Sequence, residues 1–122
     1  MEVSQDGRRI LGAKGEEAAV RFLKKHGFAI LERGFRMIRG EIDIIARDGR
    51  TLVFIEVKTR QGRGFGEAEE AVTFAKQEQI RRIAQGYLNK NRCWDVPCRF
   101  DVIAVSADAD GCWAVRHIKD AF

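Results

Sequence analysis

The stretch GEIDIIARDGRTLVFIEVKTR, residues 40–60, decides the fold that this sequence predicts. Asp48-Gly49 is a strong signal for a tight turn, because both residue types tolerate the backbone angles that a short hairpin requires. The apolar segments on either side of this turn read as two strands of a protein core. Four acidic residues and a lysine interrupt them: Glu41, Asp43, Asp48, Glu56 and Lys58. The first question about this chain is therefore why it places charge there.

The segments around the hairpin predict an α/β fold in the order α-β-β-β-α-β-β, with a mixed sheet flanked by helices. A helical period of apolar residues runs from Leu11 to Lys25, and His26-Gly27 is a typical stop. A second helical period is expected from Glu67 to Asn89. The remaining segments read as an extended strand at 28–38, a buried strand at 99–105 (RFDVIAV) and an edge strand at 112–118 (CWAVRHI).

Length and composition indicate one globular domain, residues 1–122. The chain has 45% hydrophobic and 33% charged residues and a single proline, which is typical of a folded domain of this size. Its net charge of +4 fits a partner that carries phosphates. The start, MEVSQDGRRI, has charges where a signal peptide needs apolar residues, and no apolar run approaches the roughly 20 residues of a membrane span. We expect a soluble, cytoplasmic protein that does not bind membranes.

The three cysteines do not indicate a disulfide framework or a zinc site. Cys93, Cys98 and Cys112 cannot all pair within one chain, and a reducing compartment would keep them as thiols. Cys93, Cys98 and His117 lack both a close ligand pair and a fourth ligand. Packed or surface thiols are the expected state.

The charges of the hairpin are expected on one face. If Asp48 and Gly49 are the two central turn residues, Glu41, Asp43, Glu56 and Lys58 share one side of the sheet. Asp43 and Glu56 then become diagonal neighbours, about 7 to 8 Å apart at the backbone. A bulge beside the turn would change this register.

Clustered carboxylates repel one another, so they call for a counter-charge. Hard oxygen ligands in a small group suit Mg²⁺ or Mn²⁺, which complete their coordination with water and substrate phosphate. This interpretation points to phosphate chemistry. The alternative is that Glu41 and Lys58 form exposed ion pairs on the solvated face of an edge hairpin, each contributing about 0 to 1 kcal/mol.

Two further charges lie on the apolar stripes of the predicted helices. Glu16 shares its stripe with Ala19 and Leu23, and Lys76 lies four residues before Ile80 on the second helix. Both side chains are therefore expected to face the sheet. The alternative is that each one extends along the apolar surface and reaches solvent at a helix end.

Several motifs in order resemble the YraN-like family of small bacterial proteins. They are GEID at 40–43, FIEVKTR at 54–60, FG at 65–66, EAV at 70–72, RFDVIAV at 99–105 and HIKDAF at 117–122. The resemblance runs from Gly12 to Phe122. This family is similar in motif to archaeal Holliday junction resolvases and to the PD-(D/E)xK nucleases, and it implies a restriction-endonuclease-like fold.

The resemblance also implies roles for individual residues. Asp43 matches the metal-binding aspartate, and Glu56 and Lys58 match the E-x-K pair, with the Val57 carbonyl as a backbone ligand. Glu16 matches an acidic residue that the resolvases carry on their first helix. Lys76 and Glu41 are accessory: Lys76 matches a family position without a firm role, and Glu41 is either a ligand or a structural acid. No proline precedes Asp43, which departs from the name-giving pattern.

The function implied is metal-dependent hydrolysis of phosphodiester bonds in DNA, with branched or damaged DNA as the substrate class and Mg²⁺ or Mn²⁺ as the cofactor. Lys58 would position the attacking water or stabilise the developing negative charge. Arg60 and Arg63, in a glycine-rich connection, and Arg81 and Arg82 are the expected DNA contacts; for the connection, an ordinary solvated loop is the alternative. A homodimer would match the two symmetric strands of a junction. The alternative function is a module that binds nucleic acid or a repair partner without cutting.

Overall fold

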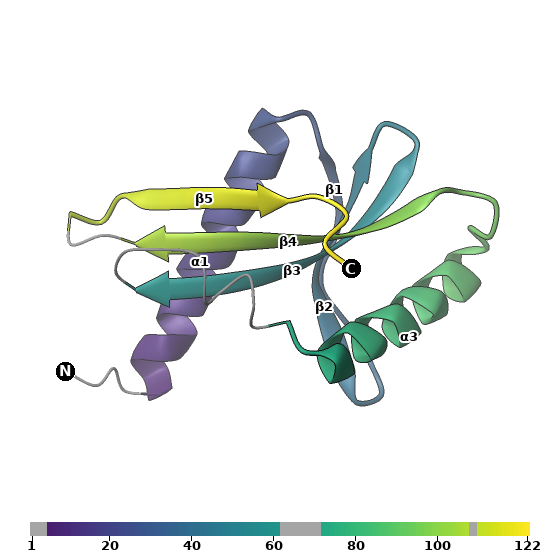
Figure 1. The fold of residues 1–122 in the computed structure, drawn as a ribbon, viewed down its shortest axis with the longest axis horizontal. Helices are drawn as coiled ribbons and strands as arrows, with labels where there is room; N and C mark the ends of the chain where they lie inside the picture. Colours follow the sequence, from purple (N-terminus) through teal and green to yellow (C-terminus); the bar gives the residue numbers. More distant parts are fainter. Residues whose placement is uncertain (1–4, 62–71, 108–109) are drawn as a thin grey trace.

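The computed structural model describes residues 5–61, 72–107 and 110–122, with the side chains of residues 5–9 and 61 excepted. Its elements are α1 (Gln5–Lys25), β1 (Ala29–Met37), β2 (Gly40–Asp48), β3 (Thr51–Gln61), α3 (Phe74–Asn91), β4 (Cys98–Ala107) and β5 (Trp113–Ile118) (Figure 1). The predicted α-β-β-β-α-β-β order is confirmed, and the α/β architecture is consistent with a restriction-endonuclease-like fold. Within these ranges, no helix has the length and apolar character that crossing a membrane would require.

The strands form one mixed sheet in the order β1-β2-β3-β4-β5. β3 and β4 are parallel, and the other neighbouring pairs are antiparallel. This arrangement confirms the two predictions for the last strands. β4 is buried from Asp101 to Ser106, whereas β5 lies at one edge of the sheet and alternates half-buried with exposed residues.

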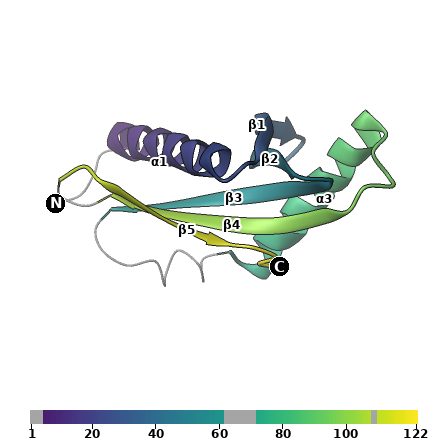
Figure 2. The same cartoon turned by 90° about the horizontal axis from the view of Figure 1, so that it is seen from above.

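The two helices cover opposite faces of the sheet, and β3 contributes to both cores. Ala19 and Leu23 of α1 pack with Ile55 on one face, and Figure 2 shows α1 along that side of β3 and β4. Ile80 and Ile83 of α3 pack with Phe54 on the other face. Because β3 is covered on both sides, its first half is a continuous apolar run.

The hairpin between β2 and β3 has a register two residues away from the predicted one. Asp48 pairs with Thr51, so Gly49 and Arg50 are the central turn residues and the prediction of Asp48-Gly49 was wrong. Gly49 adopts a φ of 62°, a conformation that glycine enters without steric cost. A shift of two residues leaves the side chains of the paired segment, Ile44 to Asp48, on their predicted faces, because side chains in a strand alternate with a period of two. Before this segment the alternation is interrupted at Asp43, since Ile42 packs in the α3 core and Ile44 in the α1 core. The shift does change which residues lie opposite one another.

The starts of both helices also differ from the prediction, whereas their ends lie close to it. α1 begins at Gln5 instead of Leu11 and ends at Lys25. Gly27 follows with a φ of 87°, as expected at a helix stop. The helix predicted from Glu67 begins at Phe74, because Thr73 adopts an extended conformation and its side chain accepts a hydrogen bond from the Lys76 N–H. Residues 62–71 lie outside the described ranges.

Candidate functional site

Asp43 is fixed by the strand that carries the E-x-K residues. The ladder between β2 and β3 ends at the pair Ile44–Ile55, and Asp43 and Glu56 directly adjoin this last pair. At this point the Val57 N–H donates a hydrogen bond to Asp43 Oδ2 at 2.8 Å. The predicted register, with Asp43 and Glu56 as diagonal neighbours, is therefore wrong, and the Asp43 carboxylate is held at Val57, between Glu56 and Lys58.

Glu56 is the most deeply buried acid of this group. It retains 6% of its surface, and its Oε1 atom lies 3.6 Å from Lys58 Nζ and 4.0 Å from Lys76 Nζ. Its second oxygen, Oε2, is buried and has no hydrogen-bond partner among the described residues. A buried carboxylate oxygen without a partner costs free energy, so Oε2 has unused capacity to accept a hydrogen bond or to bind a cation.

Burial and mutual repulsion disfavour the ionised forms of both carboxylates. Burial and the neighbouring charge of Glu56 raise the pKa of Asp43 to about 7, against the opposing hydrogen bond from Val57. Burial also raises the pKa of Glu56, although the charges of Lys76 and Lys58 lower it. The two acids are therefore placed where a cation would favour their ionised forms.

The residues present fit a small divalent cation. Two carboxylates lie close together, one oxygen lacks a partner, and main-chain carbonyls are hard oxygen donors of the kind that Mg²⁺ and Mn²⁺ prefer. In the described part of the chain, no three His, Cys, Asp or Glu side chains gather closely enough to hold an ion on their own. Such a site would therefore rely on Asp43 and Glu56, and on water or substrate oxygens for the remaining positions.

The two further acids of the prediction lie near this pair but have basic partners of their own. Glu16 is half-buried and its Oε1 atom lies 3.2 Å from Arg33 Nε. Glu41 lies on β2 with Oε2 3.0 Å from Arg36 Nε. The charges of both residues still contribute to the raised pKa of Asp43, after burial and Glu56. The structure thus brings Asp43, Glu56, Lys58 and Lys76 together, with Glu16 and Glu41 at the periphery.

The arginines predicted to contact DNA have different positions. Arg60 is exposed at the end of β3, and Arg63 lies outside the described residues. Arg81 covers the rings of Phe100 and Phe122, with its guanidinium carbon 4.8 and 5.5 Å from their centroids. Arg82 donates to the carbonyls of Ile38 and Arg39, at 3.1 and 3.2 Å. Arg81 and Arg82 therefore have structural contacts, although both remain exposed.

The sequence prediction missed the basic residues of β1 and its turn. Arg33 binds Glu16 and Glu17, Arg36 binds Glu41, and Arg39 lies in the turn that packs on α3. Their spacing of three residues in an extended segment was visible in the sequence. Their partners were not, because those come from other elements.

Comparison with known proteins identifies the family of the chain. Residues 15–105 match the model of "Uncharacterised protein family UPF0102". A UPF0102 protein from Geotalea daltonii is 51% identical over 118 residues, which cover 97% of this chain and 93% of that protein. UPF0102 proteins from Acetivibrio thermocellus and Caldicellulosiruptor saccharolyticus are 49% and 48% identical, covering 98% and 94% of this chain and 95% and 98% of their own lengths. The chain belongs to the UPF0102 family, the YraN-like family that its motifs resemble.

Proposed function

We propose that the chain is a metal-dependent nuclease that hydrolyses phosphodiester bonds in DNA, with branched or damaged DNA in repair or recombination as its substrate. The observation that carries this proposal is the buried Glu56 Oε2 atom, which has no partner among the described residues although it lies beside Asp43 and two lysines. A structural ion pair would satisfy both oxygens of its carboxylate. A site that binds an ion and a phosphate keeps such an oxygen available.

Asp43 and Glu56 would hold Mg²⁺ or Mn²⁺, with the Val57 carbonyl as a further oxygen donor. Such an ion, when bound, polarises a phosphate and lowers the pKa of a coordinated water. The Val57 N–H keeps Asp43 oriented through its 2.8 Å hydrogen bond. Preorganised ligands of this kind do not have to be rearranged at the moment of reaction.

The two lysines would act on the phosphate and on the attacking water. Lys58 Nζ lies 3.6 Å from Glu56 Oε1, at the edge of the acid pair, and its side chain is 26% exposed. It can therefore reach both the buried carboxylate and a bound substrate, where it would position water or stabilise the negative charge that develops on the phosphate. Lys76 approaches the same oxygen from α3 at 4.0 Å and is 33% exposed. From its position on α3, Lys76 would bind the substrate phosphate.

The test is a cleavage assay on purified protein with labelled linear, single-stranded and four-way-junction DNA in Mg²⁺, Mn²⁺ or EDTA. Asp43→Asn and Lys58→Ala are assayed beside the wild-type protein, and Glu32→Gln, an exposed acid of β1, is the matched control. The proposal predicts cutting that requires the metal, is lost in Asp43→Asn and Lys58→Ala, and persists in Glu32→Gln. Equal cutting by Asp43→Asn and wild type would show that the site is wrong.

The second candidate is a module that binds DNA without cutting it. The observation in its favour is the pairing of Glu16 with Arg33, which leaves two carboxylates, not three, in close contact. Tight binding of DNA with no cleavage of any substrate in either metal would support this module over the enzyme.

A further inference from the structure

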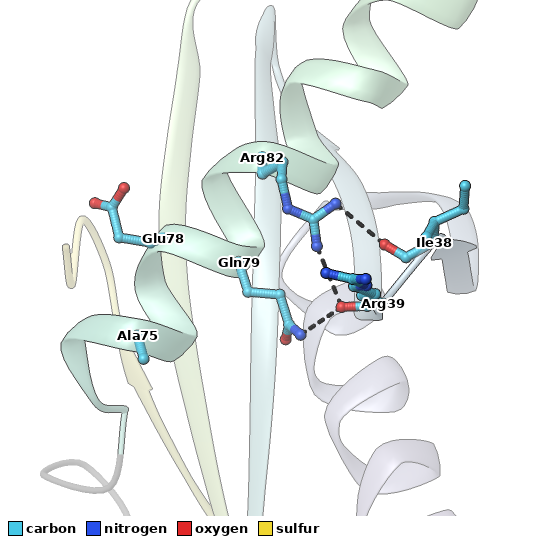
Figure 3. Close-up of a pocket in the computed structure, with 6 residues that line it drawn as sticks. All are labelled: Ile38, Arg39, Ala75, Glu78, Gln79 and Arg82. Carbon is cyan, nitrogen blue, oxygen red and sulfur yellow. Dashed lines mark hydrogen bonds between the residues drawn. The ribbon is translucent and has the colours of Figure 1, made fainter.

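The turn between β1 and β2 is held rigidly against α3 through its own main chain. Gln79 Nε2 donates to the Arg39 carbonyl at 2.6 Å, and Arg82 donates to the carbonyls of Ile38 and Arg39 (Figure 3). Three nitrogen atoms on two side chains of α3 thus donate to the carbonyl groups of two consecutive residues. Hydrogen bonds with a charged donor are among the stronger ones, so the position of this turn is fixed by α3.

Close packing adds to these hydrogen bonds. A Cβ atom at Gly40 would lie 2.7 Å from the side chains of Gln79 and Ile83, and Met37 lies across Gly86 where a Cβ atom would be. Arg39 itself has a φ of 65°, a left-handed conformation that is uncommon for a long side chain. A strained residue that its surroundings hold in place is a feature found at binding sites.

The rigid turn presents one apolar and one basic side chain to solvent. Ile38 keeps 81% of its surface exposed, the largest fraction among the large hydrophobic residues described. Arg39 is exposed as well, and no described residue forms an ion pair or hydrogen bond with its guanidinium. Main-chain contacts therefore fix this turn while leaving its side chains available to a ligand.

Two adjoining hollows lie beside this turn. The turn pocket, of about 820 Å³, is lined by Ile38, Arg39, Ala75, Glu78, Gln79 and Arg82 (Figure 3). The inner pocket, of about 460 Å³, shares Arg39 and Gln79 with it and also contains Arg36, Glu41 and Lys76. Lys76 Nζ lies 4.0 Å from Glu56 Oε1, so the inner pocket adjoins the acid pair through Lys76 and the turn pocket through Arg39 and Gln79.

The chemistry of the two pockets differs. The inner pocket has three cationic side chains, Arg36, Arg39 and Lys76, against the single acid Glu41, which suits a phosphate. The turn pocket combines the apolar surfaces of Ile38 and Ala75 with the carboxylate of Glu78, the carboxamide of Gln79 and the side chains of Arg39 and Arg82. Apolar side chains pack on the faces of nucleobases, and acidic and amide groups hydrogen-bond to their edges.

We propose that the two pockets form a track for one unpaired strand of nucleic acid, with a phosphate in the inner pocket and an unpaired base in the turn pocket against Ile38. The inference deepens the proposed function and rests on it for the position of the phosphate beside Asp43 and Glu56. It names the substrate class as DNA that carries an unpaired nucleotide. A blunt duplex offers no free base to the turn pocket, so it binds through phosphate contacts alone.

The experiment measures binding in EDTA, where no cleavage occurs. Fluorescence anisotropy gives the affinities of the full chain for a single-stranded oligonucleotide and for a blunt duplex over a range of salt concentrations. The test variants are Ile38→Ser and Arg39→Gly. The matched controls are Val96→Ser, a change at another exposed apolar residue, and Arg92→Gly. Arg92 is an exposed arginine with a φ of 53° at the far end of α3, about 20 Å along the helix from Gln79.

The wild-type protein is expected to bind the single strand at least 5-fold more tightly than the duplex. Ile38→Ser should remove most of this preference without weakening duplex binding. Arg39→Gly should lower the salt slope for the single strand by about 0.7, the value for one lost phosphate contact. A 2-aminopurine base in the strand should gain fluorescence on binding, because it leaves the stack, and this gain should be smaller in Ile38→Ser.

Equal affinity of the wild-type protein for both DNAs, or an unchanged preference in Ile38→Ser, would overturn the track while leaving the proposed cleavage intact. Conversely, a single-strand preference that depends on Ile38, together with an absence of cleavage in Mg²⁺ and Mn²⁺, would contradict the nuclease and keep the track. The two failures are therefore distinguishable.

Discussion

The Val57 N–H donates to Asp43 Oδ2 at 2.8 Å, just beyond the Ile44–Ile55 pair of the β2–β3 ladder. The Asp43 side chain thus accepts the hydrogen bond of a β3 main-chain N–H directly after the last pair of the ladder. This contact fixes Asp43 beside Glu56, and it explains why the core hairpin tolerates two acids: one is anchored to the main chain, and the other has lysines on one oxygen. The remaining oxygen of Glu56 has no partner among the described residues, and in the proposed function it is the atom that a cation would bind.

The first prediction is that Mn²⁺ stabilises the protein. A ligand that binds only the folded state at 100 times its Kd adds about 2.7 kcal/mol to the free energy of unfolding, which raises Tm by several degrees in a chain of this length. Asp43→Asn and Glu56→Gln should lose this shift, and Glu32→Gln should keep it. Differential scanning fluorimetry with and without Mn²⁺ is the measurement. A shift that both site variants retain would mean that the ion binds elsewhere.

The second prediction is that Asp43→Asn stabilises the metal-free protein. The substitution removes a buried like charge beside Glu56, and an asparagine oxygen can still accept from the Val57 N–H. We expect the free energy of unfolding in EDTA at pH 8 to rise by about 1 kcal/mol or more, as measured by urea denaturation. Asp101→Asn, at a buried acid with basic partners, should change stability in the opposite direction. A destabilised Asp43→Asn would argue that Asp43 is a structural acid.

Lys58 and Lys76 are expected to differ in their effects on cleavage. Lys58 is closer to the acid pair, so Lys58→Met should lower the single-turnover cleavage rate about 100-fold or more, as expected when a group that stabilises transition-state charge is lost. Lys76→Met should mainly weaken DNA binding, with a smaller effect on the rate. Single-turnover rates and binding isotherms separate the two roles. Equal rate losses would show that both lysines contact the reacting phosphate.

The sequence predicted the acid pair despite an error in the turn. Placing Asp48-Gly49 at the turn centre shifted the register by two residues, but Asp43 and Glu56 still adjoin each other beyond the Ile44–Ile55 pair, where the Val57 N–H holds Asp43. The E-x-K spacing lies within one strand, so it did not depend on the turn. Local pattern was therefore sufficient to place Glu56 and Lys58 side by side, and the roles of these residues stay predictions.

Contacts between distant elements could not be predicted in the same way. The Glu16–Arg33 pair depends on how α1 packs over β1, and the Arg82 bonds depend on where the β1–β2 turn meets α3. Helical periodicity predicted that Glu16 lies on the apolar stripe of α1 that faces the sheet, but it could not predict that Arg33 is its partner. The start of α3 was missed because Thr73 caps the helix after a segment with helical composition.

The fourth prediction concerns the buried network on the α1 face. Asp101 is fully buried, accepts from Arg99 at 2.9 and 3.0 Å and from the Asp120 N–H at 3.0 Å, and its Oδ2 atom lies 2.7 Å from His117 Nε2. Burial alone would raise the pKa of Asp101, but the hydrogen bonds from His117 and Arg99 outweigh it and hold the pKa below the usual 3.8. The ionised form is therefore favoured by folding.

For a carboxyl with a lowered pKa, the stabilising contribution is present above the pKa of the unfolded chain and is lost as pH falls through the folded value. The wild-type protein should thus lose stability below about pH 4. Asp101→Asn should cost about 3 kcal/mol at pH 7, and the difference from wild type should shrink toward pH 3. Urea denaturation at several pH values is the measurement. A constant difference across this range would show that the charge of Asp101 does not contribute.

The fifth prediction tests how tightly the turn packs on α3. Gly40→Ala would place a Cβ atom 2.7 Å from Gln79 and Ile83, so the turn must move or the protein loses about 1 to 3 kcal/mol of stability. Gly12→Ala is the matched control, because a Cβ atom there meets nothing within 4 Å, and alanine favours the helix. Thermal denaturation of both variants measures this difference. An equally stable Gly40→Ala would show that the turn yields easily.

The central claim is that Asp43 and Glu56 bind one divalent cation together. Anomalous diffraction from a crystal grown with Mn²⁺ tests it most directly. We predict one peak in contact with an oxygen of Asp43 and with Glu56 Oε2. An active, Mn²⁺-loaded crystal form with its only peak away from both carboxylates would contradict the claim.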